Sequence, residues 1–171
     1  QTLSYLFGEN CSCGLKEIIV TSSIDLVSRM FSIATSLETI TFNSNVTTIP
    51  DECFYNLYNL IEIKGIEKVL NVGNRAFYGC AKISTLNLSN INELGEKAFY
   101  KCSRLSELII NFIGESTKDS KSMDYLIDKE SCSLKKIVVY SGALVKNTFK
   151  NYTSIESINL KFATDTIPES C

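Results

Sequence analysis

The chain has 171 residues, of which 44% are hydrophobic and 21% charged, so it is long enough for one substantial core and short for two ordinary domains. Its 17 basic and 19 acidic side chains give a net charge of -2 at pH 7, which excludes an excess positive field of the kind that holds nucleic acid. It contains no histidine, which excludes imidazole-based catalytic triads and metal sites that need an imidazole ligand.

Seven strand-like segments recur along the chain and begin with Leu or Ile. They start at residues 15, 37, 60, 83, 105, 134 and 155, so consecutive starts are 22, 23, 23, 22, 29 and 21 residues apart. This spacing is typical of leucine-rich repeats. Positions one, four and six of most segments are apolar, which predicts strands with one buried face. A single strand cannot bury that face alone, so neighbouring units should stack into one parallel sheet over a continuous core.

The other strand positions are expected to face solvent. In the fifth and sixth units they bring Ile109, Val138 and Tyr140 together on adjacent strands, with Glu107 and Lys136 beside them. An exposed apolar patch with an aromatic residue and charged neighbours is a candidate for binding energy hot spots. We therefore predict these five residues as a ligand-binding site on the sheet. The alternative is that isolated surface aliphatics have no role, or that another part of the full protein covers them.

The second half of the unit carries a different signature, in which Ala76, Phe77 and Cys80 are spaced i, i+1 and i+4. This spacing predicts one face of a short helical turn that presses its Phe onto the back of the sheet. The phenylalanines that hold this place in their units are expected to form one buried column. They are Phe54, Phe77, Phe99 and Phe149.

These units resemble the BspA-like leucine-rich repeats, also called the Treponema pallidum type, over nearly the whole chain. The best matches are NVGNRAFYGCAKISTLNL at 71–88 and NELGEKAFYKCSRLSELII at 92–110. The resemblance implies an α/β leucine-rich-repeat solenoid: a curved right-handed coil with one parallel sheet of about seven strands, and short helical turns or coil on the opposite side. It also implies a surface-exposed or secreted protein that adheres to host or matrix components. The first and sixth units depart from the pattern, because Phe31 and Phe149 lack the following Cys.

We expect a single repeat domain over residues 1–171. Its fifth unit is lengthened by a Ser/Lys/Asp-rich insertion at 114–124, which predicts a surface loop. The chain begins at Gln1 and stops at Cys171 within a unit, so we expect it to be a fragment of a longer protein. No apolar run approaches the ~20 residues needed to cross a bilayer, and we expect no membrane span.

The seven cysteines do not form a recognisable metal or redox motif. A bond between Cys11 and Cys132, which occupy equivalent outer segments, is one alternative; the other is that the thiols act as small apolar fillers. Those in repeat columns, expected to be buried, are Cys53, Cys80, Cys102 and Cys171. The eight dispersed glycines form no phosphate-binding loop. We therefore predict no catalytic residues, no metal and no cofactor.

Three functions remain for such a chain. The first is a non-catalytic, extracellular or cell-surface module that binds a protein or glycan ligand, including host extracellular matrix. The second is a structural spacer. The third is an accessory repeat region of a larger enzyme, with catalysis elsewhere in the longer protein. Nucleic acid is not an expected partner of any of them.

Overall fold

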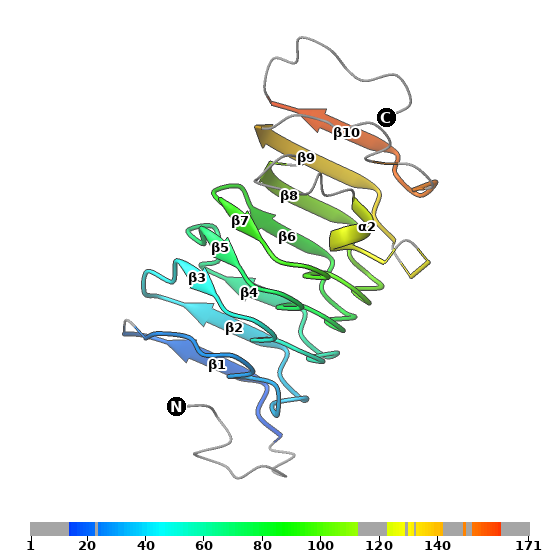
Figure 1. The fold of residues 1–171 in the computed structure, drawn as a ribbon. Helices are drawn as coiled ribbons and strands as arrows, with labels where there is room; N and C mark the ends of the chain where they lie inside the picture. The colour runs from blue at the N-terminus through cyan, green and yellow to red at the C-terminus, as the bar shows by residue number, and fades with distance from the viewer. Residues whose placement is uncertain are drawn as a thin grey trace.

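The computed structural model describes residues 14–22, 24–112, 123–128, 130–131, 133–141, 149 and 152–161. Within these residues the chain winds as a solenoid, whose coils follow one another in chain order from β1 at one end to β10 at the other (Figure 1). Where strands pair, they pair in parallel with a neighbouring coil. The repeat solenoid predicted from the sequence is confirmed.

Each of the seven expected segments contains a strand. They are β1 Glu17–Val20, β2 Thr39–Phe42, β4 Glu62–Lys64, β6 Thr85–Leu88, β8 Glu107–Phe112, β9 Lys136–Ser141 and β10 Ser157–Leu160. Their hydrogen bonds form two groups, β1-β2-β4 and β6-β8-β9-β10, instead of the single continuous sheet that we expected. The division falls after β4, which has only three residues because Gly65 follows it with a left-handed φ of 79° and takes the backbone out of strand geometry.

A second parallel sheet, which the sequence analysis did not predict, lies on another side of the coil (Figure 1). Its strands are β3 Thr48–Ile49, β5 Asn71–Val72 and β7 Glu93–Leu94. One residue of each strand is buried, namely Ile49, Val72 and Leu94. The second sheet therefore closes the core where only turns or coil had been expected.

The segments that carry the Phe residues are turns stabilised by their neighbours, and no short helix forms there. Right-handed helix is interrupted because Glu52, Arg75 and Lys97 all adopt left-handed φ angles, between 52° and 56°. Their N–H groups instead donate to the next coil. Glu52 donates to the carbonyl of Asn74 at 2.9 Å, and Arg75 donates to that of Glu96 at 2.8 Å. These bonds form a ladder, which we call the turn ladder.

The core is built from the strand positions predicted to be buried and from a stack of aromatic rings. The centroids of Phe31 and Phe54 are 5.4 Å apart, those of Phe54 and Phe77 5.2 Å, and those of Phe77 and Phe99 5.6 Å. All four side chains are buried. Three of the predicted column members are thereby confirmed, and Phe31 extends the column by one coil.

Phe149 does not join this stack, contrary to our expectation, and is only half-buried. The reason lies in the longer fifth unit, which contains no Phe in the corresponding turn. The helix α2, Met123–Leu126, occupies that position, and Phe99 donates its N–H to the carbonyl of Leu126 at 2.9 Å. Residues 114–122 of the predicted insertion lie outside the described residues. Its last two residues, Met123 and Asp124, begin α2, and Met123 is buried, so the prediction of a surface loop is wrong at that end.

Candidate functional site

The register between β8 and β9 brings the predicted site residues together on the outer face of the sheet. Glu107 lies opposite Lys136, and Ile109 lies opposite Val138. The carboxylate of Glu107 and the ammonium group of Lys136 form an ion pair at 2.8 Å. Tyr140 follows two residues beyond Val138 on β9. We call these five residues the strand patch.

The exposure predicted within the strand patch is partly wrong. Tyr140 is 45% exposed, as expected, but Val138 is only 6% exposed and Ile109 is half-buried. β9 lies between two other strands, and Val138 has Ile109 on one side and Asn159 on the other in the hydrogen-bonded register. Side chains on both neighbours therefore cover Val138, although it points away from the core. Tyr140 is therefore the most exposed of the three apolar side chains in the patch.

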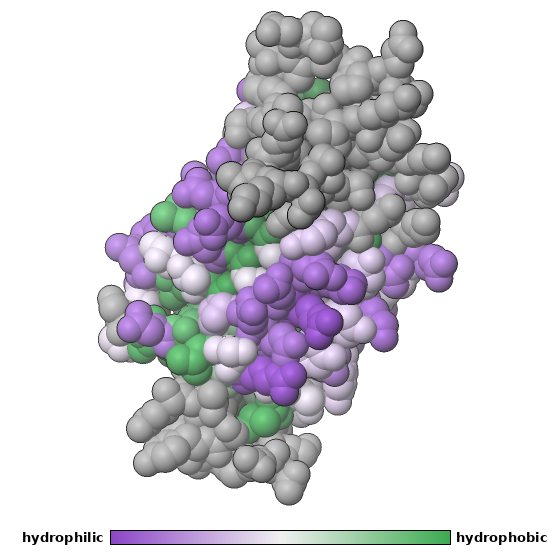
Figure 2. Space-filling view, viewed as in Figure 1, coloured by the Kyte–Doolittle hydropathy of each residue, from purple (hydrophilic) through white to green (hydrophobic). Residues whose placement is uncertain are grey.

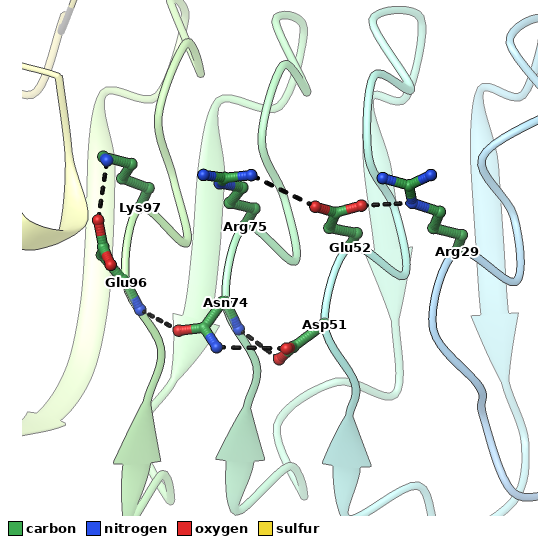
Figure 3. Close-up of polar contacts among 7 residues, drawn as sticks. All are labelled: Arg29, Asp51, Glu52, Asn74, Arg75, Glu96 and Lys97. Carbon is green, nitrogen blue, oxygen red and sulfur yellow. Dashed lines mark hydrogen bonds and ion pairs between the residues drawn. The ribbon is translucent and has the colours of Figure 1, made fainter.

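A row of polar side chains links successive coils at the start of the turns (Figure 3). Asn74 donates its N–H to Asp51 Oδ1 at 2.7 Å and its side-chain amide to Oδ2 at 3.2 Å. The Oδ1 atom of Asn74 then accepts the N–H of Glu96 at 2.8 Å. These side chains accept hydrogen bonds from backbone N–H groups where each coil enters its turn. This structural role is enough to account for polar residues at these positions.

The residues after this row form a second row, in which the carboxylate of Glu52 lies between two arginines and Lys97 follows on the next coil (Figure 3). The carboxylate of Glu52 binds Arg29 on one side and Arg75 on the other, the latter at 3.6 Å. Lys97 pairs with Glu96 at 2.8 Å. Glu52 and Glu96 each face a cation, and the carboxylate of Asp51 accepts hydrogen bonds from Asn74, so the rows do not form an acidic pocket. No group of His, Cys, Asp or Glu in the described part of the chain has the arrangement of a metal site.

The three cysteines in the described repeat columns are buried, as expected. The Sγ–H groups of Cys80 and Cys102 donate to the carbonyls of Phe54 and Phe77, each at 3.1 Å. Burial raises the pKa of Cys53 to about 12 and raises that of Cys80 well above its usual value. These two thiols therefore stay protonated and cannot act as nucleophiles near neutral pH. Cys11, Cys13, Cys132 and Cys171 lie outside the described residues.

A groove on the turn side was not anticipated from the sequence. It has a volume of about 440 Å³ and follows the turns of three successive coils as far as Asp128 in the fourth. Its lining residues are Tyr55, Arg75, Tyr78, Lys97, Tyr100, Lys101 and Asp128. The available signal was the tyrosine that directly follows Phe54, Phe77 and Phe99 in each turn. We call this feature the tyrosine groove.

Comparison with known protein families identifies the family of this repeat. The pattern described as BspA type leucine rich repeat region matches residues 4–123 in six copies. The chain belongs to this family. None of the curated proteins compared with it matches. Among the described residues, no helix of this BspA-type chain has the length and apolar character needed to traverse a lipid bilayer.

Solved structures of bacterial repeat proteins share the fold. A Treponema pallidum leucine-rich repeat protein is 17% identical with a TM-score of 0.62, over 86% of this chain and 70% of that one. The pneumococcal vaccine antigen PcpA is 18% identical with a TM-score of 0.63, over 90% and 37% of the two chains. A leucine-rich cell surface protein from Faecalibacterium prausnitzii is 17% identical with a TM-score of 0.52, over 85% and 43%. The chain thus spans less than half of the length of the latter two proteins.

Proposed function

We propose that this BspA-type chain is a non-catalytic module of a cell-surface or secreted protein, which binds a protein or glycan ligand and serves adhesion to host or matrix components. The observation that carries the proposal is the strand patch. There the register of β8 and β9 sets the ion pair of Glu107 and Lys136 and an exposed tyrosine on one face of the sheet. Tyr140 lies four residues further along β9, with Ile109 and Val138 between it and the ion pair. Tyrosine within a polar, charged rim is the composition that protein interfaces favour.

The chemistry of the described core favours binding over catalysis. The thiols of Cys53 and Cys80 are buried and held protonated, which removes them as nucleophiles. The sequence offers no histidine as a general base. A repeat solenoid, in contrast, presents side chains at the same height on successive strands, so several weak contacts can act on one large partner. A surface location is supported by the similar fold of the leucine-rich cell surface protein from Faecalibacterium prausnitzii.

A binding screen with a matched pair of variants tests the proposal. The recombinant chain is applied to immobilised host matrix proteins and to a glycan array, and each ligand found is titrated with Tyr140→Ala and Tyr58→Ala. Tyr58 is 51% exposed but lies outside the strand patch, so it controls for loss of any surface tyrosine. We expect Tyr140→Ala to weaken binding about tenfold or more, as loss of a hot-spot side chain does, and Tyr58→Ala to leave it unchanged.

Two outcomes count against the proposal. If Tyr140→Ala and Tyr58→Ala bind every identified ligand equally well, the strand patch is not the binding surface. If the folded chain binds nothing in either screen, a structural spacer becomes the better interpretation.

A further inference from the structure

The tyrosine groove differs in chemistry from the strand patch, because its walls are phenols and charged groups. The rings of Tyr55 and Tyr78 stack with centroids 5.0 Å apart and planes 13° apart. The ammonium nitrogen of Lys101 lies 5.3 Å from the centroid of the Tyr78 ring, and that of Lys97 lies 5.8 Å from that of Tyr100. The stacked faces of Tyr55 and Tyr78 are thus turned toward each other. Their ring edges and hydroxyl groups are what these half-buried side chains can offer to a ligand.

The balance of charge in the lining is positive. Arg75, Lys97 and Lys101 supply three cations, and Asp128 supplies one carboxylate. That carboxylate is engaged locally, because it accepts the hydroxyl of Ser131 at 2.9 Å and the N–H of Glu130 at 3.1 Å. A hydrogen bond with Tyr78 raises the pKa of Lys101, with smaller electrostatic contributions from Tyr55 and Asp128, so the ammonium group stays charged at physiological pH.

Two of these cations also pair with acidic residues beside the groove, Arg75 with Glu52 at 3.6 Å and Lys97 with Glu96 at 2.8 Å. The pair of Lys97 and Glu96 is exposed, and exposed pairs are weak and exchange partners at little cost. In the other pair Arg75 is 49% exposed, although Glu52 is only 16% exposed. An incoming anionic ligand that contacts both Arg75 and Lys97 can therefore replace Glu52 and Glu96 as their ionic partners. Recognition at the groove should then depend on several simultaneous contacts and should weaken as salt is added.

The groove is poorly suited to a peptide. The backbone of its turns is already bonded to the next coil, since Phe77 donates to Ala98 at 2.9 Å and Gly79 donates to Tyr100 at 2.8 Å. A peptide strand thus finds no open edge to extend. The lining also includes no aliphatic side chain that would form a pocket for an apolar anchor.

From these observations we propose that the tyrosine groove binds an acidic glycan, whose carboxylate or sulfate groups pair with Arg75, Lys97 and Lys101 while the tyrosine hydroxyls bond to its sugar hydroxyls. The hydroxyl donors and the three cations of the groove suit a polysaccharide, whose repeating units are rich in oxygen atoms. The groove also runs across successive coils, so an extended polysaccharide could lie along it. This site adds to the proposed binding module without depending on the strand patch. Either proposal can therefore be refuted by experiment without refuting the other.

The test uses two soluble acidic glycans and a matched pair of double variants. Heparin oligosaccharides carry sulfate and oligogalacturonate carries carboxylate alone, so together they distinguish the acidic group; dextran is the neutral control. Lys97→Gln/Lys101→Gln removes two groove cations. Lys16→Gln/Lys135→Gln removes two exposed lysines elsewhere, which pair with Glu38 and Glu156, so the net charge changes equally.

By isothermal titration we expect the groove variant to bind at least one acidic glycan about tenfold more weakly or worse, the usual scale for losing charged hydrogen bonds, and the control variant to bind within about twofold of the parent. Dextran should not bind. Tyr78→Phe, which keeps the ring stack and removes one hydroxyl, should weaken binding by a smaller factor, and Tyr140→Ala should have no effect.

Equal losses in the two double variants would show that only overall charge matters and would overturn the proposal. So would the absence of binding to both acidic glycans by the folded parent chain. Polyglutamate serves as a competitor: displacement of the glycan at equal charge concentration would assign the groove to acidic protein segments instead. Circular dichroism of each variant confirms that a lost affinity is not a lost fold.

Discussion

The rings of Phe54 and Phe77 stack with their centroids 5.2 Å apart and their planes 27° apart, although the two residues lie in successive units of the chain. Both side chains are fully buried. Each ring contacts the equivalent ring in the coil before and the coil after, so the stack joins successive units within the core. Stability in this solenoid therefore depends on contacts between neighbours, as in other repeat proteins.

Truncation of Phe77 to alanine should cost about 3–5 kcal/mol of unfolding free energy, the usual penalty for removing a buried phenylalanine. The measurement is chemical unfolding followed by circular dichroism. Phe149→Ala is the control, since Phe149 is half-buried and outside the stack, and it should cost clearly less. A cost below about 1 kcal/mol for Phe77→Ala would contradict the central place that the structure gives this ring.

Gly95→Ala should be among the most destabilising small substitutions. An added Cβ at Gly95 would collide with the backbone of Gly73 and Asn74 in the preceding coil, and backbone cannot rotate aside as a side chain does. We expect a loss of about 3 kcal/mol, at the upper end of the usual range for overpacking. Gly14→Ala is the control, because nothing lies within 4 Å of its added Cβ, and it should change stability by under about 0.5 kcal/mol. Similar melting temperatures for the two variants would disprove the close approach.

Stability should fall as the pH rises above about 8.5, the ordinary pKa of a thiol in an unfolded chain. In the folded protein the pKa of Cys53 is about 12 and that of Cys80 is also well raised, both chiefly by burial. Above pH 8.5 the unfolded state loses protons that the folded state keeps, so alkaline pH favours unfolding. Urea unfolding between pH 7 and pH 10 measures this slope. Cys53→Ala should make the slope shallower, and an unchanged slope would show that this thiol does not cause it.

The ion pair between Glu107 and Lys136 should contribute little to stability. Their side chains are 30% and 47% exposed, so solvent screens the 2.8 Å contact. A double-mutant cycle with Glu107→Gln and Lys136→Gln should yield a coupling free energy of about 0.2–1 kcal/mol. A coupling above about 2 kcal/mol would contradict this expectation and would mean that the pair has a structural role.

The strand positions could be predicted because their signal extends over whole units. Leu37, Ile40 and Phe42 show it in one segment: apolar residues at positions one, four and six, all of which are buried. The exposure of Val138 could not be predicted in the same way. Alternation tells which face of a strand a residue occupies, but coverage also depends on the neighbouring strands, and Val138 lies between β8 and β10. The binding role of the strand patch stays a prediction.

The second sheet and the turn conformation have weaker signals. Strands such as β5, Asn71–Val72, contain two residues, which is too short to show a period. The left-handed φ angles of Arg75 and Lys97 fall on residues that do not usually adopt them, and they depend on hydrogen bonds between coils. The tyrosine groove depends on the same turns. Its tyrosines are visible in the sequence, but their stacking and the approach of Lys101 follow only from how the coils are placed.

The turn ladder gives the solenoid a direction. The N–H groups of Glu52, Arg75 and Lys97 all donate to the coil that follows, and the last of them bonds to Tyr125 even though the intervening unit is longer. The two sides of a coil are therefore not equivalent, because one side donates N–H groups and the other accepts with carbonyl groups. A coil inserted in the reverse orientation would place N–H groups opposite N–H groups, and these hydrogen bonds would be lost. Length can change by copying or deleting whole units in the same orientation, which leaves the junctions alike. Gene duplication is thus a simple route by which such a chain grows, and internal recombination a simple route by which it shortens.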